Sequence, residues 1–209
     1  MRAPLALATA IVVAPATAVA DRREASLHAH AIGGLVTLGG PATDDTSSAL
    51  ALGVAARASY ATSNRFQYDA QLAVLAGSAD WDRGTFDTRG GTVTGPFSRG
   101  VQAARLDAGV TLRFGVALIP TVRVALGVQG VRYGAAEVDN GASTVTATGS
   151  DALGLHLIGS ASACLDYRVN RRLIVGAAAG ASLAVPGVGE AWRSFDVTLH
   201  AAYYYYPRW

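Results

Sequence analysis

Residues 49–74 read ALALGVAARASYATSNRFQYDAQLAV, and apolar side chains recur at every second position on both sides of a polar turn. Before the turn, one face carries Leu50, Leu52, Val54, Ala56, Ala58 and Tyr60. After the turn, one face carries Phe66, Tyr68, Ala70, Leu72 and Val74. A period of two is the signal of strands with one apolar face. The pattern therefore predicts an antiparallel β-hairpin that turns at residues 62–64.

The hairpin pattern occurs twice more, and a single alternating segment stands at each end of the chain. The predicted strands outside the first hairpin cover residues 26–38, 104–114, 122–128, 153–167, 173–183 and 194–206. In the first of these strands, Gly33-Gly34 leaves open a β-bulge that switches faces. The total is eight strands, and an even strand number is typical of bacterial outer-membrane barrels.

Short turns alternate with long polar or glycine-rich segments along the chain. The long segments are residues 39–48, 78–100, 133–150 and 185–193. Outer-membrane barrels show this asymmetry, with short periplasmic turns and long extracellular loops, whereas a β-sandwich has shorter strands and no such alternation. The predicted fold class is all-β: an eight-stranded antiparallel up-and-down transmembrane β-barrel.

The first twenty residues have the composition of an export signal. Arg2 gives a positive start, residues 5–13 are apolar, and Ala18-Val19-Ala20 offers small residues for cleavage. We therefore expect a signal peptide at residues 1–20 and one outer-membrane β-barrel domain at residues 21–209. Cys164 is the sole cysteine, so no intramolecular disulfide can form.

Charge and hydropathy narrow the range of partners. The 17 basic residues nearly balance the 15 acidic ones and form no basic block, so we expect no nucleic-acid partner. After residue 20 the chain has no run of about twenty apolar residues suited to a spanning helix. We also expect a monomer.

Aromatic side chains gather on the apolar face next to short turns or the C-terminus. This set comprises Tyr60, Phe66, Tyr68, Phe114, Tyr167, Tyr203, Tyr205 and Trp209. Aromatic residues form girdles at both interfaces of a transmembrane barrel, where an amphipathic ring gains apolar contact and water together. The positions predict one membrane-interface belt on the periplasmic side.

Over residues 21–209 the chain resembles the small outer-membrane barrels of OmpA and OmpX type, including a final strand that ends in an aromatic residue. The alternation of Leu199, Tyr203, Tyr205 and Trp209 resembles the signal read by the barrel-assembly machinery, and Pro207 departs from it. The resemblance implies a location in the bacterial outer membrane, contact with its lipid, and insertion through the C-terminal strand.

The polar faces of the strands predict the lining of the barrel. They carry Arg57, Asp69, Arg105, Asp107, Arg113, Arg123, His156, Asp166, Asp196 and His200. An eight-stranded barrel has an interior just wide enough for side chains, so inward charges should pair with one another. Arg57 and Asp69 are equally far from the first turn, which predicts an ion pair between them. A polar plug is the favoured interpretation, and a narrow ion path is the alternative.

Three patterns in the sequence resemble catalytic or metal sites. His156, Ser160, Ser162 and Asp166 share a strand face, but at about 3.3 Å per residue they lie too far apart for a triad. His28 and His30 resemble a metal-ligand pair and fit polar lining better. Asp80, Asp82 and Asp87 lack the other ligands of a calcium loop. We therefore expect no enzyme activity, no metal and no cofactor.

The favoured function is a structural or surface-interaction role through four extracellular loops. Loop 78–100 is the candidate for an extracellular ligand, with Trp81, Phe86 and Phe97 as contact residues and with arginines 83, 89 and 99 open to protease. The first alternative is a small pore for ions or small hydrophobic solutes. The second alternative is a lipid-modifying outer-membrane enzyme.

Overall fold

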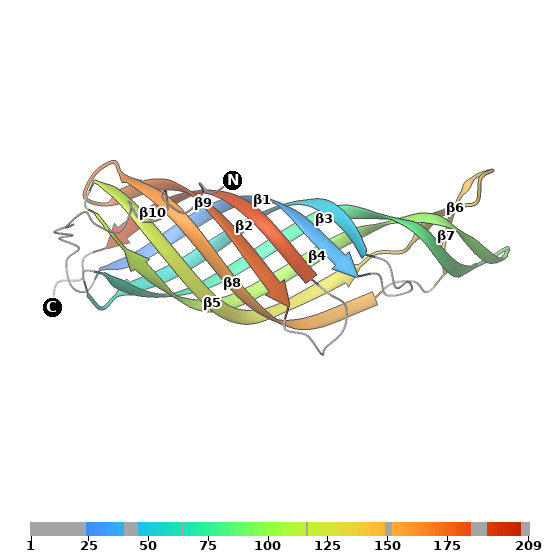
Figure 1. Ribbon diagram of the computed structural model, residues 1–209, viewed down its shortest axis with the longest axis horizontal. Helices are drawn as coiled ribbons and strands as arrows, with labels where there is room; N and C mark the ends of the chain where they lie inside the picture. Colours follow the sequence, from blue (N-terminus) through green and yellow to red (C-terminus); the bar gives the residue numbers. More distant parts are fainter. Residues whose placement is uncertain are drawn as a thin grey trace, which may run out of the picture.

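The computed structural model describes residues 24–39, 46–63, 65–115, 117–148, 152–184 and 192–205 (Figure 1). These residues form ten β-strands and no helix that is long and apolar enough to cross a membrane. The strands are β1 (Ala25–Gly39), β2 (Thr46–Ala61), β3 (Phe66–Thr88), β4 (Gly91–Arg113), β5 (Leu118–Tyr133), β6 (Glu137–Asp139), β7 (Thr144–Thr146), β8 (Ala152–Arg168), β9 (Leu173–Ala184) and β10 (Trp192–Tyr205). The predicted signal peptide and Trp209 lie outside the described residues.

Eight of the strands close into a ring. Each long strand pairs antiparallel with its neighbour in the chain, and β1 pairs with β10 to complete the circle. The two remaining strands, β6 and β7, form a small hairpin that pairs with β4. The predicted eight-stranded antiparallel up-and-down barrel is confirmed.

The turns at one end of the ring are short and built from local hydrogen bonds. In the turn between β8 and β9, the side chain of Asn170 accepts hydrogen bonds from the backbone N–H groups of Arg172 and Leu173 at 2.8 and 2.9 Å. In the turn between β4 and β5, Gly115 has φ of 98°, a conformation that favours glycine. These turns hold neighbouring strands in register.

The first strand runs without interruption. Its pairing with β2 and with β10 proceeds residue by residue past Gly33 and Gly34. The alternative of a β-bulge at these glycines is therefore wrong. A register shift does occur in β3, between Trp81 and Gly84.

The opposite end of the ring carries an outward extension rather than a loop. β2 pairs with β3 only as far as Gly77, whereas β3 and β4 stay paired out to Thr88 and Gly91. Figure 1 shows β3 and β4 running well past the ring, with β6 and β7 alongside. The prediction of loops at 78–100 and 133–150 is therefore wrong, and we call residues 78–100 and 134–148 the extension.

The extension has its own apolar core. The ring of Trp81 stacks on Phe97 at 5.0 Å, and Phe86 meets Phe97 edge-on at 4.7 Å. Val138 packs in the same cluster. Trp81, Phe86 and Phe97 are 3%, 7% and 3% exposed. The prediction that they contact a ligand is wrong, because they hold the extension together.

Burial also changes the expected protease sites. Arg99 is 3% exposed, with its guanidinium 5.3 Å from the ring centre of Phe86 and 5.7 Å from that of Phe97. Arg89 lies exposed in the turn at the tip.

Trypsin added to the folded protein in detergent should cut after Arg89 and leave the bond after Arg99 intact, because cleavage needs a locally exposed backbone. Mass spectrometry of the fragments provides the measurement. The unfolded protein is the control and should be cut at both positions. Equal cleavage rates at the two sites in the folded protein would contradict a packed extension.

Candidate functional site

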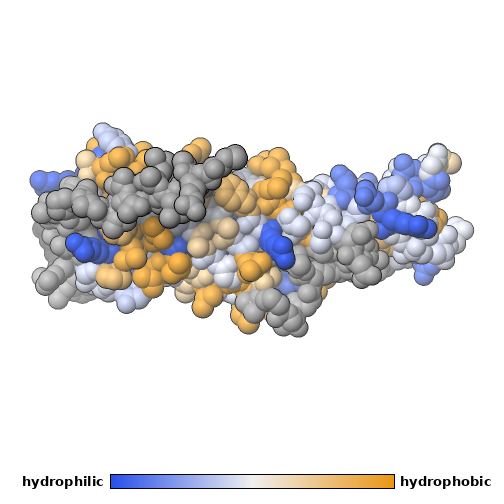
Figure 2. Space-filling view, viewed as in Figure 1, coloured by the Kyte–Doolittle hydropathy of each residue, from blue (hydrophilic) through white to orange (hydrophobic). Residues whose placement is uncertain are grey.

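The outer surface of the ring exposes a larger continuous apolar area than proteins in water do. Outward side chains such as Leu126 and Leu153 are 73% and 80% exposed, and other leucines and valines continue the same face around the ring. Exposed apolar surface of this extent marks a membrane or an interface. Figure 2 shows apolar side chains concentrated over the ring and hydrophilic side chains over the extension.

Seven of the predicted interface aromatics are described, and all point outward. Tyr60, Phe66, Tyr68, Phe114, Tyr167, Tyr203 and Tyr205 are between 43% and 62% exposed. All lie at or near the strand ends that meet the short turns, and Tyr60 and Tyr68 face each other across β2 and β3. Their role as a membrane-interface belt stays a prediction.

Inside the ring, a chain of ion pairs crosses several strands. Nη2 of Arg123 lies 2.5 Å from Oδ1 of Asp69 and 2.5 Å from Oδ1 of Asp107. Asp107 also lies 3.1 Å from Nε of Arg105, and Thr111 donates to Asp69 at 2.9 Å. The structure thus brings four of the predicted lining residues into one network.

The predicted ion pair between Arg57 and Asp69 is wrong. In the β2–β3 register, Arg57 lies opposite Gln71, and Asp69 lies opposite Ser59. The carboxylate of Asp69 is taken by Arg123 from β5, while Nη2 of Arg57 donates to Nδ1 of His28 at 3.0 Å.

Arg113 has a partner that sequence reasoning missed. Its Nη1 donates to Oε2 of Glu24 at 3.1 Å, and its guanidinium lies 5.3 Å from the ring centre of Tyr204. Glu24 stands just before β1, outside the alternating pattern used to assign the lining. A nearby unpaired arginine was the available signal that such a carboxylate was needed.

His156 and Asp196 are two further predicted lining residues. His156 is buried opposite Gln129, ten positions from Asp166 along β8, which is roughly 33 Å. Asp196 lines a cavity of about 40 Å³ together with His30, Arg57 and Arg105. This cavity has room for a few water molecules at most.

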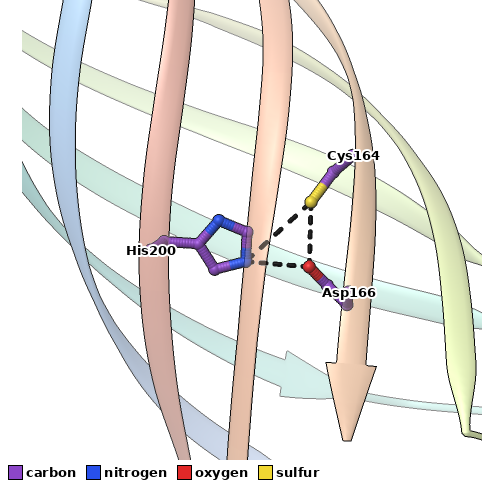
Figure 3. Close-up of side chains that lie close together, drawn as sticks. All are labelled: Cys164, Asp166 and His200. Carbon is purple, nitrogen blue, oxygen red and sulfur yellow. Dashed lines mark hydrogen bonds and ion pairs between the residues drawn. The ribbon is translucent and has the colours of Figure 1, made fainter.

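A second cluster joins Cys164, Asp166 and His200 (Figure 3). Oδ1 of Asp166 accepts hydrogen bonds from Nε2 of His200 at 2.8 Å and from Sγ of Cys164 at 2.9 Å. Sγ of Cys164 lies 3.8 Å from the same Nε2. The polar-face pattern identified Asp166 and His200 but not Cys164, although Cys164 and Asp166 stand two positions apart on one strand.

The half of the interior nearer the extension is largely apolar, although it also holds the buried Gln129 and His156. Val36, Leu38, Val101, Val131, Tyr133 and Ile158 are each at most 5% exposed and belong to one cluster with the core of the extension. We call these six residues the apolar seal. The charged network therefore lies toward the short turns, and apolar side chains dominate the half of the interior nearer the extension.

These features define a class: a small, closed β-barrel of the bacterial outer-membrane type, with an apolar outer band and a filled interior. No family model matches the chain, and no curated protein matches it by sequence.

Solved structures of this class are similar in fold. The Neisserial surface protein A (NspA) matches with a TM-score of 0.57 at 10% identity, over 86% of this chain and 96% of that protein. Ail of Yersinia pestis, in complex with the heparin analogue sucrose octasulfate, matches at 0.51 and 11%, over 88% and 100%. OprG from Pseudomonas aeruginosa matches at 0.51 and 10%, over 89% and 97%. The predicted resemblance to small outer-membrane barrels is confirmed at the level of fold.

Removing the carboxylate of Asp69 should destabilise the barrel. Asp69→Ala leaves the buried Arg123 with one counter-ion fewer, which we expect to lower the free energy of unfolding by about 3 kcal/mol. The double variant Asp69→Ala with Arg123→Ala should lose less than the sum of the two single losses. Urea unfolding in lipid vesicles, followed by tryptophan fluorescence, measures both.

The matched control is Asp82→Asn, an exposed position on the extension, which should change the free energy by less than about 0.5 kcal/mol. Purely additive losses for Asp69 and Arg123 would contradict the network.

Proposed function

We propose that this chain is an outer-membrane surface-interaction protein, whose barrel holds the extension rigidly outside the membrane for contact with a partner that has a basic surface. The observation that carries the proposal is the aromatic core of the extension. A segment that only connected two strands would not need Trp81 stacked on Phe97 inside a paired hairpin. Rigid presentation lowers the entropy lost on binding.

The charge of the extension supports a basic partner. Its exposed acidic side chains are Asp80, Asp82, Asp87, Glu137 and Asp139, while its exposed basic side chains are Arg83 and Arg89. A surface of one dominant sign attracts partners of the opposite sign and repels others. The similar Ail structure holds a polyanion, and the acidic extension here disfavours such a ligand.

The apolar packing inside the barrel favours a structural role over a pore. An ion would have to cross the apolar seal, in which Leu38, Val131 and Tyr133 are at most 1% exposed. Moving a charge through unhydrated apolar packing is strongly unfavourable. The pore is therefore the second candidate. Lipid modification is the third, and no cluster of catalytic groups faces outward among the described residues to favour it.

Export and assembly complete the proposal. Residues 1–20 would be removed as a signal peptide, and residues 21–209 would insert as one monomeric barrel domain. The outward alternation of Leu199, Tyr203 and Tyr205 on β10 supports recognition by the barrel-assembly machinery, and the exposed apolar band supports contact with outer-membrane lipid.

Binding to charged surfaces tests the surface-interaction role. The purified barrel in nanodiscs should be retained on immobilised polylysine at low salt and released by salt, and heparin should not retain it. The variant Asp80→Asn, Asp82→Asn, Glu137→Gln keeps the core of the extension and should lose most of the retention. Stronger binding to heparin than to polylysine, or equal retention of the variant, would overturn the basic-partner proposal.

Conductance separates the barrel from a pore. In planar bilayers the folded protein should show no discrete current steps, because the apolar seal excludes hydrated ions. The control is Leu38→Ala with Tyr133→Ala, which shortens two side chains of the seal and should raise the leak current. Regular current steps from the unaltered protein would favour the pore.

A further inference from the structure

Three different metal-ligand side chains converge at one point inside the ring. Cys164 and Asp166 come from β8 and His200 comes from β10, and their Sγ, Oδ1 and Nε2 atoms lie within 4.8 Å of one another (Figure 3). We propose that Cys164, Asp166 and His200, completed by His30, bind a zinc ion. This site is independent of the proposed surface interaction.

A glycine makes the convergence possible. Asp166 and His200 stand on strands that are separated by β9, and both lie opposite Gly176 of β9. Strands two apart are about 9.6 Å from each other, so the two side chains meet only by reaching over the middle strand. A Cβ at Gly176 would collide with Oδ1 of Asp166 and would lie 2.8 Å from Cε1 of His200. Any side chain at position 176 would therefore block the contact.

The arrangement is that of ligands and not that of a nucleophile with its base. In a catalytic triad the nucleophile and the carboxylate contact opposite nitrogens of the histidine ring. Here Sγ of Cys164 and Oδ1 of Asp166 both approach Nε2 of His200, at 3.8 and 2.8 Å. Three donor atoms that face a common point suit a cation between them.

The distances fit zinc after a small movement. Zinc bonds of about 2.0 to 2.3 Å in tetrahedral geometry place donor atoms about 3.4 to 3.6 Å apart. The distance from Cys164 to His200, 3.8 Å, is already close to this range. The two short distances, 2.8 and 2.9 Å, share Oδ1 of Asp166. A shift of that one carboxylate oxygen by about 0.8 Å away from both atoms corrects both distances.

His30 is placed to supply the fourth ligand. It lies opposite His200 in the β1–β10 pair, and the ring centres are 5.0 Å apart. His30 is 7% exposed, and its Nε2 has no hydrogen-bond partner among the described residues. A buried nitrogen without a partner is costly, and coordination would satisfy it.

Charge and donor type favour zinc over calcium or magnesium. A thiolate and two imidazoles are soft or borderline donors that suit zinc, whereas calcium and magnesium require oxygen ligands. The Cys164 thiolate and the Asp166 carboxylate offset the two charges of the ion, which leaves the site neutral beside Arg57. Binding displaces the thiol proton to solvent.

The site is closed on its turn side. Ile119, Ile174, Ala202 and Tyr204 form a buried cluster between it and the short turns, each at most 2% exposed. The apolar seal closes the loop side. We therefore expect zinc to enter while the barrel folds and to leave only slowly from the folded protein.

Refolding in the presence of zinc tests the proposal. Untagged protein, refolded into detergent with zinc and dialysed against a chelator, should retain one zinc per barrel by elemental analysis. Refolding with cobalt should give the near-ultraviolet absorption of a cobalt–thiolate bond, which reports on Cys164 directly. Protein that receives zinc only after folding should take up much less.

Single substitutions separate ligands from neighbours. Cys164→Ser and His200→Gln should lower retained zinc at least about tenfold, since even residues beyond the ligands change affinity by that factor. His30→Gln should weaken retention, and Gly176→Ala should abolish it. His156→Gln, another buried histidine of the ring, is the matched control and should retain zinc fully. Heat-modifiable migration on a gel confirms that each variant is folded.

No retained zinc in the folded unaltered protein would overturn the proposal. Equal retention by Cys164→Ser, His200→Gln and the unaltered protein would also overturn it, because the ion would then sit elsewhere.

Discussion

The need to satisfy every backbone N–H and C=O group in a medium without water governs this molecule. A sheet in lipid has no solvent for its edges, so it must close on itself, and here β1 pairs with β10 through fourteen consecutive partners. Closure with eight strands fixes a narrow interior. That interior must be filled by side chains whose polar atoms find partners inside, because lipid surrounds the wall and offers none.

The narrow interior leads to contacts that skip a strand. Asp69 on β3 reaches Arg123 on β5 across β4, and Asp166 on β8 reaches His200 on β10 across β9. In both cases the middle strand has a glycine opposite the carboxylate, Gly109 or Gly176. Strong curvature of the wall brings inward side chains of next-nearest strands together, and the missing side chain opens the path. These two ion pairs therefore join next-nearest strands, whereas Arg57 and His28 are opposite each other on adjacent strands.

This geometry explains which features of the barrel could be predicted from the sequence and which could not. The period of two is strong over residues 49–74, and it predicted the strand number of the ring and the antiparallel order, because a one-residue slip would turn every apolar side chain away from lipid. The Arg57–Asp69 pair failed because the register places Arg57 opposite Gln71 and because Asp69 pairs with Arg123 across β4. Glu24 and Cys164 were not assigned to the lining, because Glu24 lies before the first strand and Cys164 is a small residue that fits either face.

The extension was missed for a different physical reason: the alternation reverses its sense where the surroundings change from lipid to water. Along β3 the apolar side chains point outward up to Val74, whereas Ala79, Trp81 and Phe86 are buried. On β5, Arg132 is exposed between the buried Val131 and Tyr133. β3 does not end where the alternation reverses, since its pairing with β4 continues to Thr88. The prediction assumed that the outward face of a strand stays apolar along its whole length. Under that assumption, a polar, glycine-containing stretch after a lipid-facing strand is assigned as a loop. Outside the membrane, water favours polar side chains on the outward face and apolar side chains on the inward face. The same strand can therefore continue past the bilayer with the apolar face turned inward, where its aromatic residues are buried in the extension instead of contacting lipid.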